Sequence, residues 1–336
     1  MGYINLDKKA FFKNAEYYTK LLGSKDKICI ALKDNAYGHG IEPMCELSRE
    51  YGINHVMVRN ITEANISSKY YFESILVMYE IPTKEYPTNY IFSLNGLEDI
   101  KKCPENIKIE LKIDTGMGRN GIFPSQIVEA LQIIKKKNLN LNGVFTHFSS
   151  ADENDNLTFI QENLFLKSIA FIKSKIDTPF RIHCANSVGT HKVNNELYDI
   201  ARIGIGLYGY LDIEEVQDLV EPILSFHANK ISTKVLNVGD SIGYGSIYKV
   251  KNNNFVVSNY DVGYGDGFFR LSEHKKAFTS DKKEILGRVS MDSLSVEGDA
   301  NTICLFNNAR ELANVHNTIH YEILTNIHAN VPKYII

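Results

Sequence analysis

A lysine follows an apolar run near the start of the chain. Residues 28–32 read Ile-Cys-Ile-Ala-Leu, and Lys33 comes next, before a polar turn with two glycines. At the carboxyl end of a buried strand, apolar walls would lower the pKa of the lysine amine and leave more of the nucleophilic free base. Such an amine can form a Schiff base with an aldehyde cofactor, and Tyr37 could place a phenol near the phosphate of that cofactor. The alternative, which this segment alone does not exclude, is a lysine that only extends its ammonium to solvent.

Other polar residues of chemical interest fall where predicted strands end. Lys112, Asp114 and Arg119 lie at and after one strand, and His147 follows the next. Loops are polar in most proteins, so each placement alone is weak, but agreement across five strands favours a shared site. The remaining members of this group lie at the last two strands and are Asn186, Ser187 and Arg202.

A glycine-rich turn begins at Arg202 and ends at Gly209 (Arg-Ile-Gly-Ile-Gly-Leu-Tyr-Gly). Without a Cβ, glycine lets backbone N–H groups come close to a phosphate. Asn186 and Ser187 add short hydrogen-bonding side chains. Glycine after a strand more often marks a simple turn. In a chain that also has a candidate Schiff-base lysine, however, this segment predicts a phosphate-binding turn, or cradle.

The elements that must position these residues are eight short apolar runs separated by segments with helical periodicity. Helices are predicted at 41–51, 125–137 and 157–176. Eight strand–helix units in about 200 residues predict an α/β fold, an N-terminal (β/α)8 TIM barrel with its chemistry at the carboxyl ends of the strands. A doubly wound sheet is the alternative, but no G-x-G-x-x-G follows the first strand. The predicted strands are 27–32, 54–59, 74–79, 90–94, 107–113, 141–146, 180–183 and 199–203.

The pattern changes after about residue 215, where strand-like runs follow one another with glycine, asparagine and aspartate between them. This pattern predicts a C-terminal, mainly antiparallel β-domain. We expect domains at 1–215 and 216–336, with the first few residues joining the β-domain, and a helix at 315–327. The strands predicted in the second domain are 228–238, 254–259, 285–289, 293–296 and 302–306.

Composition bounds the function further. The 336 residues are 44% hydrophobic and 23% charged, with a net charge of −3, and no block rich in Lys or Arg indicates nucleic acid or an anionic membrane as partner. No apolar run approaches the roughly 18 residues of a membrane span, and the N-terminus lacks a signal core, so a cytoplasmic protein is expected. The five cysteines are scattered without a C-x-x-C spacing, which argues against a disulfide framework or a zinc site, and no metal is expected.

Several segments together resemble the bacterial alanine racemase family of fold-type III pyridoxal-phosphate enzymes. Lys33–Gly40 (Lys-Asp-Asn-Ala-Tyr-Gly-His-Gly) resembles the cofactor-attachment motif of that family. The resemblance extends from residues 4–6 to residues 331–333, nearly the whole chain. Further matching segments follow in the family's order, at 112–121, 202–209, 261–267 and 287–292.

The resemblance implies pyridoxal 5′-phosphate as cofactor and a role for each matching residue. Lys33 would carry the cofactor, and Arg202 would contact the pyridine nitrogen. Because a guanidinium stays charged, Arg202 would oppose protonation of that nitrogen, which makes the cofactor a weaker electron sink and suits racemisation. The other residues expected to bind the cofactor are Tyr37, His147, Asn186, Ser187, Gly204 and Ile205.

The resemblance also implies a substrate site. Arg119 is expected to contact the substrate carboxylate and the phenolic oxygen of the cofactor. The lysine matching Lys112 is often carbamylated in the family, and an uncharged amine there would react with carbon dioxide to give an anion that holds Arg119. Met291 and Asp292 match a segment that closes the carboxylate pocket from the partner subunit, and Ser290 stands where many relatives carry cysteine.

Racemisation needs an acid–base group on each face of the flat cofactor–substrate adduct. Lys33 would serve one face, and Tyr264, which matches the family's catalytic tyrosine, would serve the other. A phenol has an ordinary pKa of about 10, so it needs a relay or a cationic environment, which His147 with Arg202 behind it could supply. Because the family pairs the barrel of one subunit with the β-domain of the other, Tyr264 is expected from the partner chain of a head-to-tail homodimer.

The resemblance therefore implies the family's activity, the interconversion of L-alanine and D-alanine by two-base proton transfer on a pyridoxal-phosphate aldimine, which supplies D-alanine for peptidoglycan. A preference for serine or another small amino acid stays open, since a pocket rejects one added hydroxyl by only about 100-fold. Ala329, where many relatives have a phosphate-contacting tyrosine, leaves that contact open as well.

Two alternatives belong to other classes. One is a metal-dependent barrel hydrolase with carbamylated Lys112 as a ligand, although no H-x-H pair lies on the first strand. The other is a non-catalytic pyridoxal-phosphate carrier, which would keep Lys33. The segments around Tyr264 and Met291 argue against the carrier.

Overall fold

The computed structural model describes residues 2–153, 155–271 and 275–336, and the chain divides into two compact units. The barrel unit comprises Lys9–Asp34 and Met44–Glu221. The β-unit comprises Met1–Lys8, Asn35–Pro43 and Pro222–Ile336. The short segment Asn35–Pro43, inside the range expected for the barrel, therefore belongs to the β-unit.

Eight parallel strands in the order β8-β7-β6-β5-β4-β3-β2-β9 form the barrel unit, which confirms the predicted (β/α)8 architecture. Each strand lies within two residues of its predicted bounds. β8 and β9 lie at the two ends of this order, and backbone hydrogen bonds join residues next to them. The Arg202 N–H donates to the Ala185 carbonyl at 3.0 Å, and the Asp199 N–H donates to the Ile182 carbonyl at 2.9 Å. The strands are β2 Ile28–Ala31, β3 His55–Val58, β4 Ser74–Val77, β5 Tyr90–Leu94, β6 Lys108–Lys112, β7 Asn140–Phe145, β8 Arg181–His183 and β9 Ala201–Ile203.

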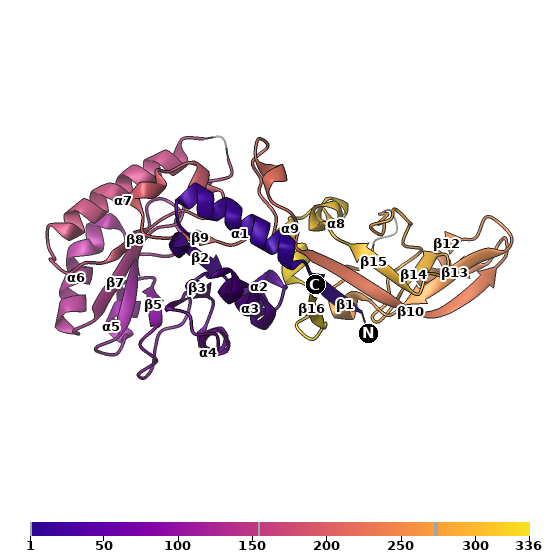
Figure 1. Cartoon of the computed structure of the whole chain (residues 1–336), viewed down its shortest axis with the longest axis horizontal. Coiled ribbons are helices and arrows are strands. Elements are labelled where there is room, and N and C mark those ends of the chain that lie inside the picture. Colours follow the sequence, from indigo (N-terminus) through magenta and orange to yellow (C-terminus); the bar gives the residue numbers. More distant parts are fainter. Residues whose placement is uncertain (1, 154, 272–274) are drawn as a thin grey trace. The chain divides into compact units, whose positions relative to one another are not determined.

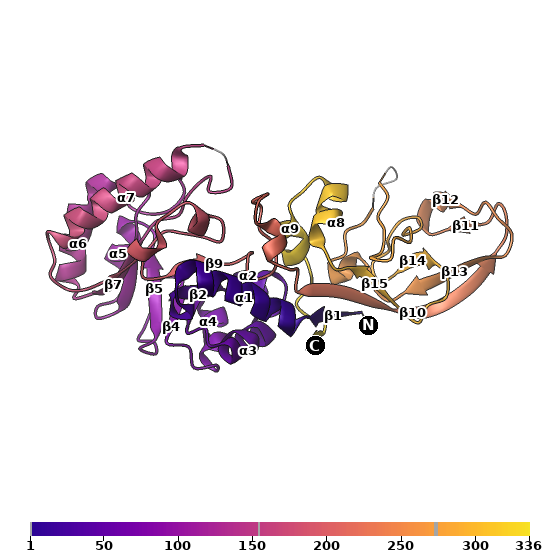
Figure 2. The same cartoon turned by 45° about the horizontal axis from the view of Figure 1, so that its top comes forward.

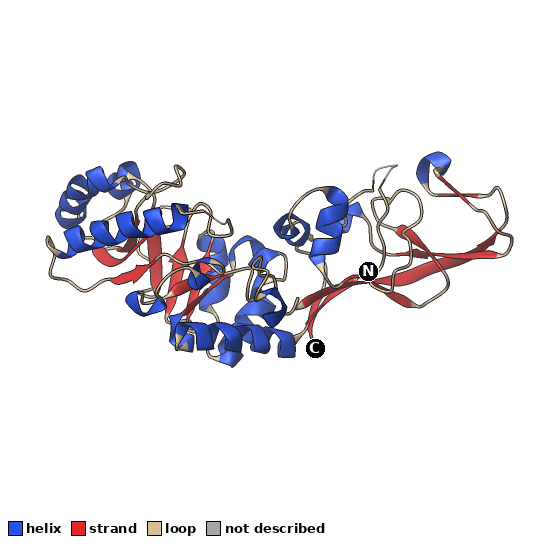
Figure 3. Ribbon diagram, turned by 90° about the horizontal axis from the view of Figure 1, so that it is seen from above, coloured by secondary structure: helices blue, strands red, loops and turns tan. Residues whose placement is uncertain are grey.

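Helices surround these strands (Figure 3), as a buried parallel sheet requires. The helix predicted at 41–51 is present with those bounds, and the other two predicted helices end up to three residues early. Within the described residues, no helix is both long enough and apolar enough to cross a membrane. The helices are α1 Lys8–Leu22, α3 Ile41–Tyr51, α4 Ile61–Ser68, α5 Leu97–Lys102, α6 Ile127–Lys136 and α7 Leu157–Lys173.

The β-unit is built on the long strand β10, Leu224–Leu236 (Figure 1). This strand pairs antiparallel with β1, β13 and β15, which confirms the mainly antiparallel prediction, while β16 pairs parallel with β1. The far end of the sheet buries Ile242, Val250, Val257 and Leu286 together. The other strands are β1 Tyr3–Leu6, β11 Ser241–Ile242, β12 Tyr248–Lys249, β13 Phe255–Tyr260, β14 Leu294–Glu297, β15 Thr302–Phe306 and β16 Lys333–Ile335.

Two predictions for the β-unit were wrong. Residues 285–289 do not form a strand; Ile285 makes only an isolated bridge to Val296. The single helix expected at 315–327 is two helices that lie side by side in Figures 1 and 2, α8 Ala309–His316 and α9 His320–Thr325. The break falls at Asn317, which has a φ of +55° and caps α8, because asparagine tolerates this left-handed conformation.

Short 3-10 turns complete the described elements, and one of them carries a candidate site residue. They are Lys25–Lys27, Pro124–Gln126, Gly189–His191, Asn195–Leu197, Gln217–Leu219, Tyr244–Ser246 and Tyr264–Asp266.

Candidate active site

The backbone immediately after Lys33 is left-handed. In α2, Lys33–Tyr37, the four residues from Asp34 to Tyr37 have φ between +52° and +54°. Each such non-glycine residue costs roughly 1–2 kcal/mol, so surrounding contacts must hold the turn. Gly38 ends it with a φ of +79°, where an added Cβ would lie 1.9 Å from the Leu324 carbonyl oxygen. A strained turn that persists directly behind the candidate lysine is typical of a functional segment.

Lys33 itself lies just beyond β2 with its side chain partly exposed. Its Nζ is 3.7 Å from Oδ2 of Asp34, and Nη1 of Arg59 is 2.7 Å from Oδ1 of the same carboxylate. Asp34 is thus shared by two cations. The arrangement holds the lysine amine at the carboxyl end of the barrel strands, as the sequence predicted.

Four cations lie close enough to His147 to disfavour a charge on its ring. Burial and then Arg202, Lys112, Arg119 and Lys33 lower the pKa of His147 well below its usual value, so the imidazole is neutral at neutral pH. Lys112 is only 3% exposed, and burial together with Arg119 and Arg202 lowers the pKa of its amine to about 8. The barrel unit therefore brings together side chains from four strand ends with an excess of positive charge, which favours an anionic ligand.

Arg202 is held by its neighbours. Its Nη2 donates to the carbonyls of Thr146 at 2.8 Å and Cys184 at 2.9 Å, and contacts Nδ1 of His147 at 3.2 Å. Because a guanidinium only donates, Nδ1 of His147 accepts, and the proton of the neutral ring lies on Nε2.

The glycine-rich turn and the Asn-Ser pair also come together. Oγ of Ser187 accepts from the backbone N–H groups of Gly204 and Gly206, at 3.1 Å each. An added Cβ at Gly206 would lie 2.0 Å from the Tyr18 hydroxyl, so close packing requires that glycine. The neighbouring Ile205 is buried. The structure thus brings Ser187 and the glycine-rich turn together from two strand ends.

The loop that carries Arg119 is shaped by Asp114. One oxygen, Oδ1, accepts from the N–H groups of Gly116 and Met117, at 2.9 Å each, and of Gly118, at 3.1 Å. These bonds favour the ionised carboxylate. Asp114 therefore fixes the course of the loop that begins two residues after Lys112.

The remaining predicted residues lie in the β-unit. The Tyr264 N–H donates to the Ser290 carbonyl at 3.0 Å, and the Gly265 N–H to the Met291 carbonyl at 2.8 Å, so two distant segments lie side by side. A Cβ at Gly263 would lie 2.2 Å from the Met291 carbonyl oxygen and 2.5 Å from the Asp292 nitrogen, which makes glycine necessary. Tyr264 and Met291 are 42% and 55% exposed.

Tyr37 has a neighbour that sequence reasoning missed. Its ring centroid lies 5.9 Å from that of Tyr321 on α9, in a tilted arrangement. Nothing local in the sequence marks Tyr321, since the two residues are far apart along the chain. Ala329, the departure noted above, is exposed.

The residues present fit pyridoxal phosphate. They offer an amine just after the first barrel strand and hydroxyl and backbone groups at a glycine-rich turn, with an excess of cations at the same strand ends. In the described part of the chain, no group of three or more His, Cys, Asp or Glu could hold a metal ion. The barrel, the antiparallel β-unit and this site define the class of fold-type III pyridoxal-phosphate enzymes.

The family follows from comparison with known proteins. The model for the alanine racemase N-terminal domain matches residues 6–212, and that for the alanine racemase C-terminal domain matches residues 223–335. The chain belongs to the alanine racemase family, whose members are isomerases that use pyridoxal phosphate.

Relatives match over their full length. The chain is 35% identical to the alanine racemase of Campylobacter jejuni subsp. doylei over 336 residues, covering 100% of both chains. It is 36% identical to the alanine racemase of Nitratiruptor sp., covering 99% of both. The crystal structure of alanine racemase from Bacillus anthracis with bound L-Ala-P is similar with a TM-score of 0.86 and 26% identity, covering 100% of this chain and 95% of that one.

Proposed function

We propose that this chain interconverts L-alanine and D-alanine, with Lys33 and Tyr264 as the two proton-handling groups. The observation that carries the proposal is the contact of Arg202 with His147 at 3.2 Å among further cations, in a chain that matches alanine racemases from end to end. When bound, pyridoxal phosphate withdraws electrons from the substrate α-carbon and so acidifies its proton.

The barrel residues bind and orient. Lys33 would hold the cofactor through Nζ. Its phosphate would be held by Ser187 and Gly204, together with Asn186, Ile205 and Tyr37. Arg202 would contact the ring nitrogen and oppose its protonation, because the fixed charge of the guanidinium disfavours a second cation alongside. Arg119 forms a charge-assisted pair with the substrate carboxylate. Together these contacts restrict the substrate to one orientation.

The α-proton of the substrate must be removed and returned on both faces of the flat cofactor–substrate adduct. Nζ of Lys33 removes or returns the α-proton on one face, and the Tyr264 hydroxyl does so on the other. His147 supports the phenol, because its Nε2 carries a proton that can be donated to the tyrosine oxygen once that oxygen is negative. The adjoining Arg202 stabilises that negative charge.

Lys112, once carbamylated, would fix the position of the Arg119 guanidinium. With its pKa lowered to about 8, roughly a tenth of this amine is uncharged at neutral pH and open to carbon dioxide. The resulting carbamate is an anion beside Arg119 and would hold the guanidinium in place. We expect carbon-13 from labelled bicarbonate to attach at this residue.

The active form is a head-to-tail homodimer in which Tyr264, Met291 and Asp292 come from the partner subunit. The exposure of Tyr264 and Met291 on the β-unit supports this arrangement, since large apolar side chains are usually covered in a working assembly. We further infer that the enzyme works in the cytoplasm, where it supplies D-alanine for peptidoglycan. Its five free cysteines, four of them buried, suit a reducing compartment.

The experiment compares kcat/KM for L-alanine, L-serine and L-lysine in both wild type and Lys33→Ala, with an absorbance spectrum of each. We expect alanine to be the best substrate. Lys33→Ala should lose about 10³-fold or more in both directions, because it removes one acid–base group and the cofactor attachment together. Lys136→Ala, an exposed lysine on α6, is the control and should keep full activity. A fully active Lys33→Ala would refute the proposal, and a higher kcat/KM for serine would favour the serine racemase alternative.

A further inference from the structure

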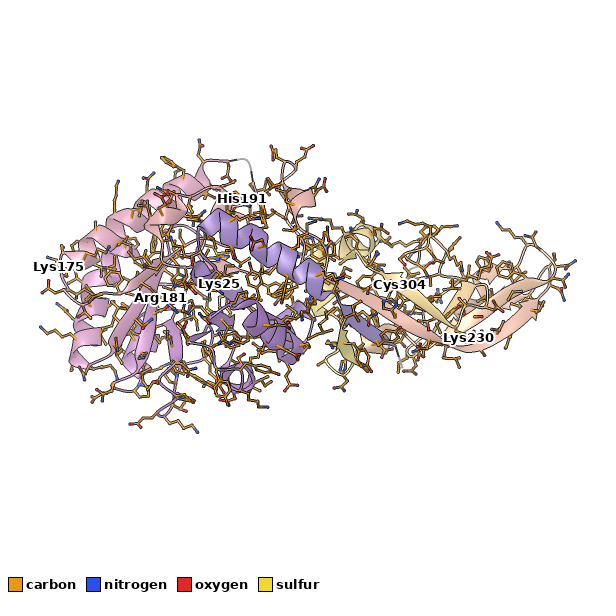
Figure 4. All side chains as sticks on the ribbon, viewed as in Figure 1. Lys25, Lys175, Arg181, His191, Lys230 and Cys304 are labelled. Atoms are coloured by element: carbon orange, nitrogen blue, oxygen red, sulfur yellow. The ribbon has the colours of Figure 1, made fainter. Side chains whose placement is uncertain are left out.

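A buried polar network crosses the barrel strands next to Arg202. Glu110 on β6 is fully buried. Its Oε2 lies 2.9 Å from Nε2 of His183, and its Oε1 accepts from Nε of Arg181, both on β8. Nη1 of Arg181 in turn donates to Oγ of Ser74 at 3.0 Å. Figure 4 labels Arg181 on the barrel unit, and Glu110 and His183 of this network are fully buried.

His183 links Glu110 to Arg202. Its Nδ1 is 2.6 Å from Nη1 of Arg202. A guanidinium only donates and an ionised carboxylate only accepts, so a neutral His183 with its proton on Nε2 satisfies both contacts at once. The ring of Phe145 stacks on His183 at 4.9 Å and also faces the Arg202 guanidinium at 5.1 Å. The imidazole therefore has one orientation and one tautomer that fit.

The ionisation states agree with this geometry. Burial opposes ionisation of Glu110, but Arg181 and His183 outweigh it and hold the pKa of the carboxyl at about 2. Burial lowers the pKa of His183 to about 4, although Glu110 acts against it. At neutral pH the carboxylate is charged and the imidazole neutral, so each contact has one donor and one acceptor.

Strand β7 lies between Glu110 and Arg181 and leaves room for the ion pair that these two residues form. Gly143 on β7 pairs with Glu110 on one side and with Arg181 on the other. A Cβ at Gly143 would lie 2.7 Å from Oε1 of Glu110 and 2.9 Å from Cγ of Arg181. Gly143 does not have a positive φ, so space and not backbone conformation requires the glycine. The chain thus accommodates this ion pair at a position where other side chains would block it.

We propose that Glu110 is a positioning residue of the active site, which keeps His183 in its Nε2–H tautomer and thereby holds the Arg202 guanidinium in a single orientation. The role in catalysis rests on the proposed function, in which Arg202 faces the ring nitrogen of the cofactor. The effect on His183 does not, because it concerns the barrel unit alone.

The test reads the tautomer of His183 directly. Protein labelled with nitrogen-15 histidine is studied without added cofactor by long-range proton–nitrogen NMR, with His183 assigned by the loss of its signals in His183→Gln. We expect the Nε2–H form in the wild type at neutral pH. In Glu110→Gln that form should be lost. Because Arg181 only donates, the glutamine oxygen should face Arg181, which leaves the new NH2 group, a donor, facing Nε2 of His183. An unchanged tautomer in Glu110→Gln would overturn the proposal.

Two further variants sharpen the test. Adding Arg181→Met to Glu110→Gln removes the competing donor, so the glutamine oxygen can accept from His183 and the Nε2–H form should return. This double variant also tests the proposal if Glu110→Gln alone does not fold, and any other tautomer in it would count against the role. Glu162→Gln, which alters a carboxylate that accepts from the Tyr198 hydroxyl at 2.6 Å, is the control and should change nothing at His183.

The loaded enzyme gives the second readout. Glu110→Gln should lower kcat about tenfold or more while KM for alanine changes less than about threefold, and the double variant should recover most of kcat. Loss of activity with an unchanged tautomer would contradict the positioning role. A wild type without racemase activity would instead refute the proposed function and leave the tautomer result standing.

Discussion

Lys112 is an amine enclosed among guanidinium groups. Its burial and the charges of Arg119 and Arg202 lower its pKa to about 8 from an ordinary 10.5. Between these two values the unfolded chain binds more protons than the folded one, so the stability of the fold rises with pH across this window. Below about pH 8 the residue carries its full destabilising effect, which is the expected cost of a charged amine buried near guanidinium groups.

Replacing Lys112 with methionine tests this cost. We expect Lys112→Met, in protein free of cofactor and carbon dioxide, to raise the melting temperature at pH 7 by about 3 °C. Each kcal/mol added to the free energy of unfolding raises the melting temperature by about 2–4 °C in a domain of about 150–250 residues. The gain should shrink as the pH rises from about 8 and disappear well above pH 10.5, where the wild-type amine has lost its proton in both states. Calorimetry at the two pH values makes the measurement. An equal gain at both pH values would show that the packing of the methionine, and not the removal of a charge, sets the effect.

At the scale of elements, the turn Tyr264–Asp266 depends on its contact with residues 290–292. Gly263 allows the two segments to approach, because its missing Cβ leaves room for the Met291 carbonyl. Backbone hydrogen bonds to residues 290 and 291 then help to position the partly exposed Tyr264. A displacement of one segment must therefore move the catalytic candidate directly.

Gly263→Ala should separate these segments. An added Cβ 2.2 Å from a carbonyl oxygen forces the backbone to shift, and kcat should fall about tenfold or more, since small misplacements of a reacting group are costly. Steady-state kinetics with a melting curve measure both effects. The matched control is Gly96→Ala, whose Cβ would meet nothing within 4 Å and which should leave kcat unchanged. Equal kinetics in the two variants would rule out this role for the contact.

At the scale of the whole molecule, the proposed site needs residues from both units: Lys33 from the barrel unit and Tyr264 from the β-unit. If the two come from different subunits, each active site of the homodimer is composite. Inactive variants of the two residues should then complement each other.

Mixing Lys33→Ala with Tyr264→Ala in equal amounts, followed by subunit exchange, tests this. Half of the dimers would be mixed, and each of these would have one intact site of two, so activity should return to about a quarter of the wild-type value. Sedimentation verifies the dimer, and each variant incubated alone is the control. If Tyr264 served its own chain, the mixture would stay as inactive as its components.

Much of this protein can be predicted from local sequence. Apolar runs spaced by helical segments predicted all eight barrel strands, because burial on both faces leaves a near-continuous apolar pattern. The candidate site residues lie on those strands or within a few residues of their ends, so Lys33, Lys112, His147, Ser187 and Arg202 could be identified as candidates from position and type alone.

Only the tertiary structure decided features that depend on partners distant in sequence. Glu110 on β6 and His183 on β8 are 73 residues apart, and nothing in either local pattern indicates that they pair. The left-handed turn after Lys33 contradicts local backbone preference, and it places Asn35–Pro43 in the β-unit. Hydrogen bonds and strained conformations of this kind are stabilised by the assembled fold, so they become visible only when the contacting segments are seen together.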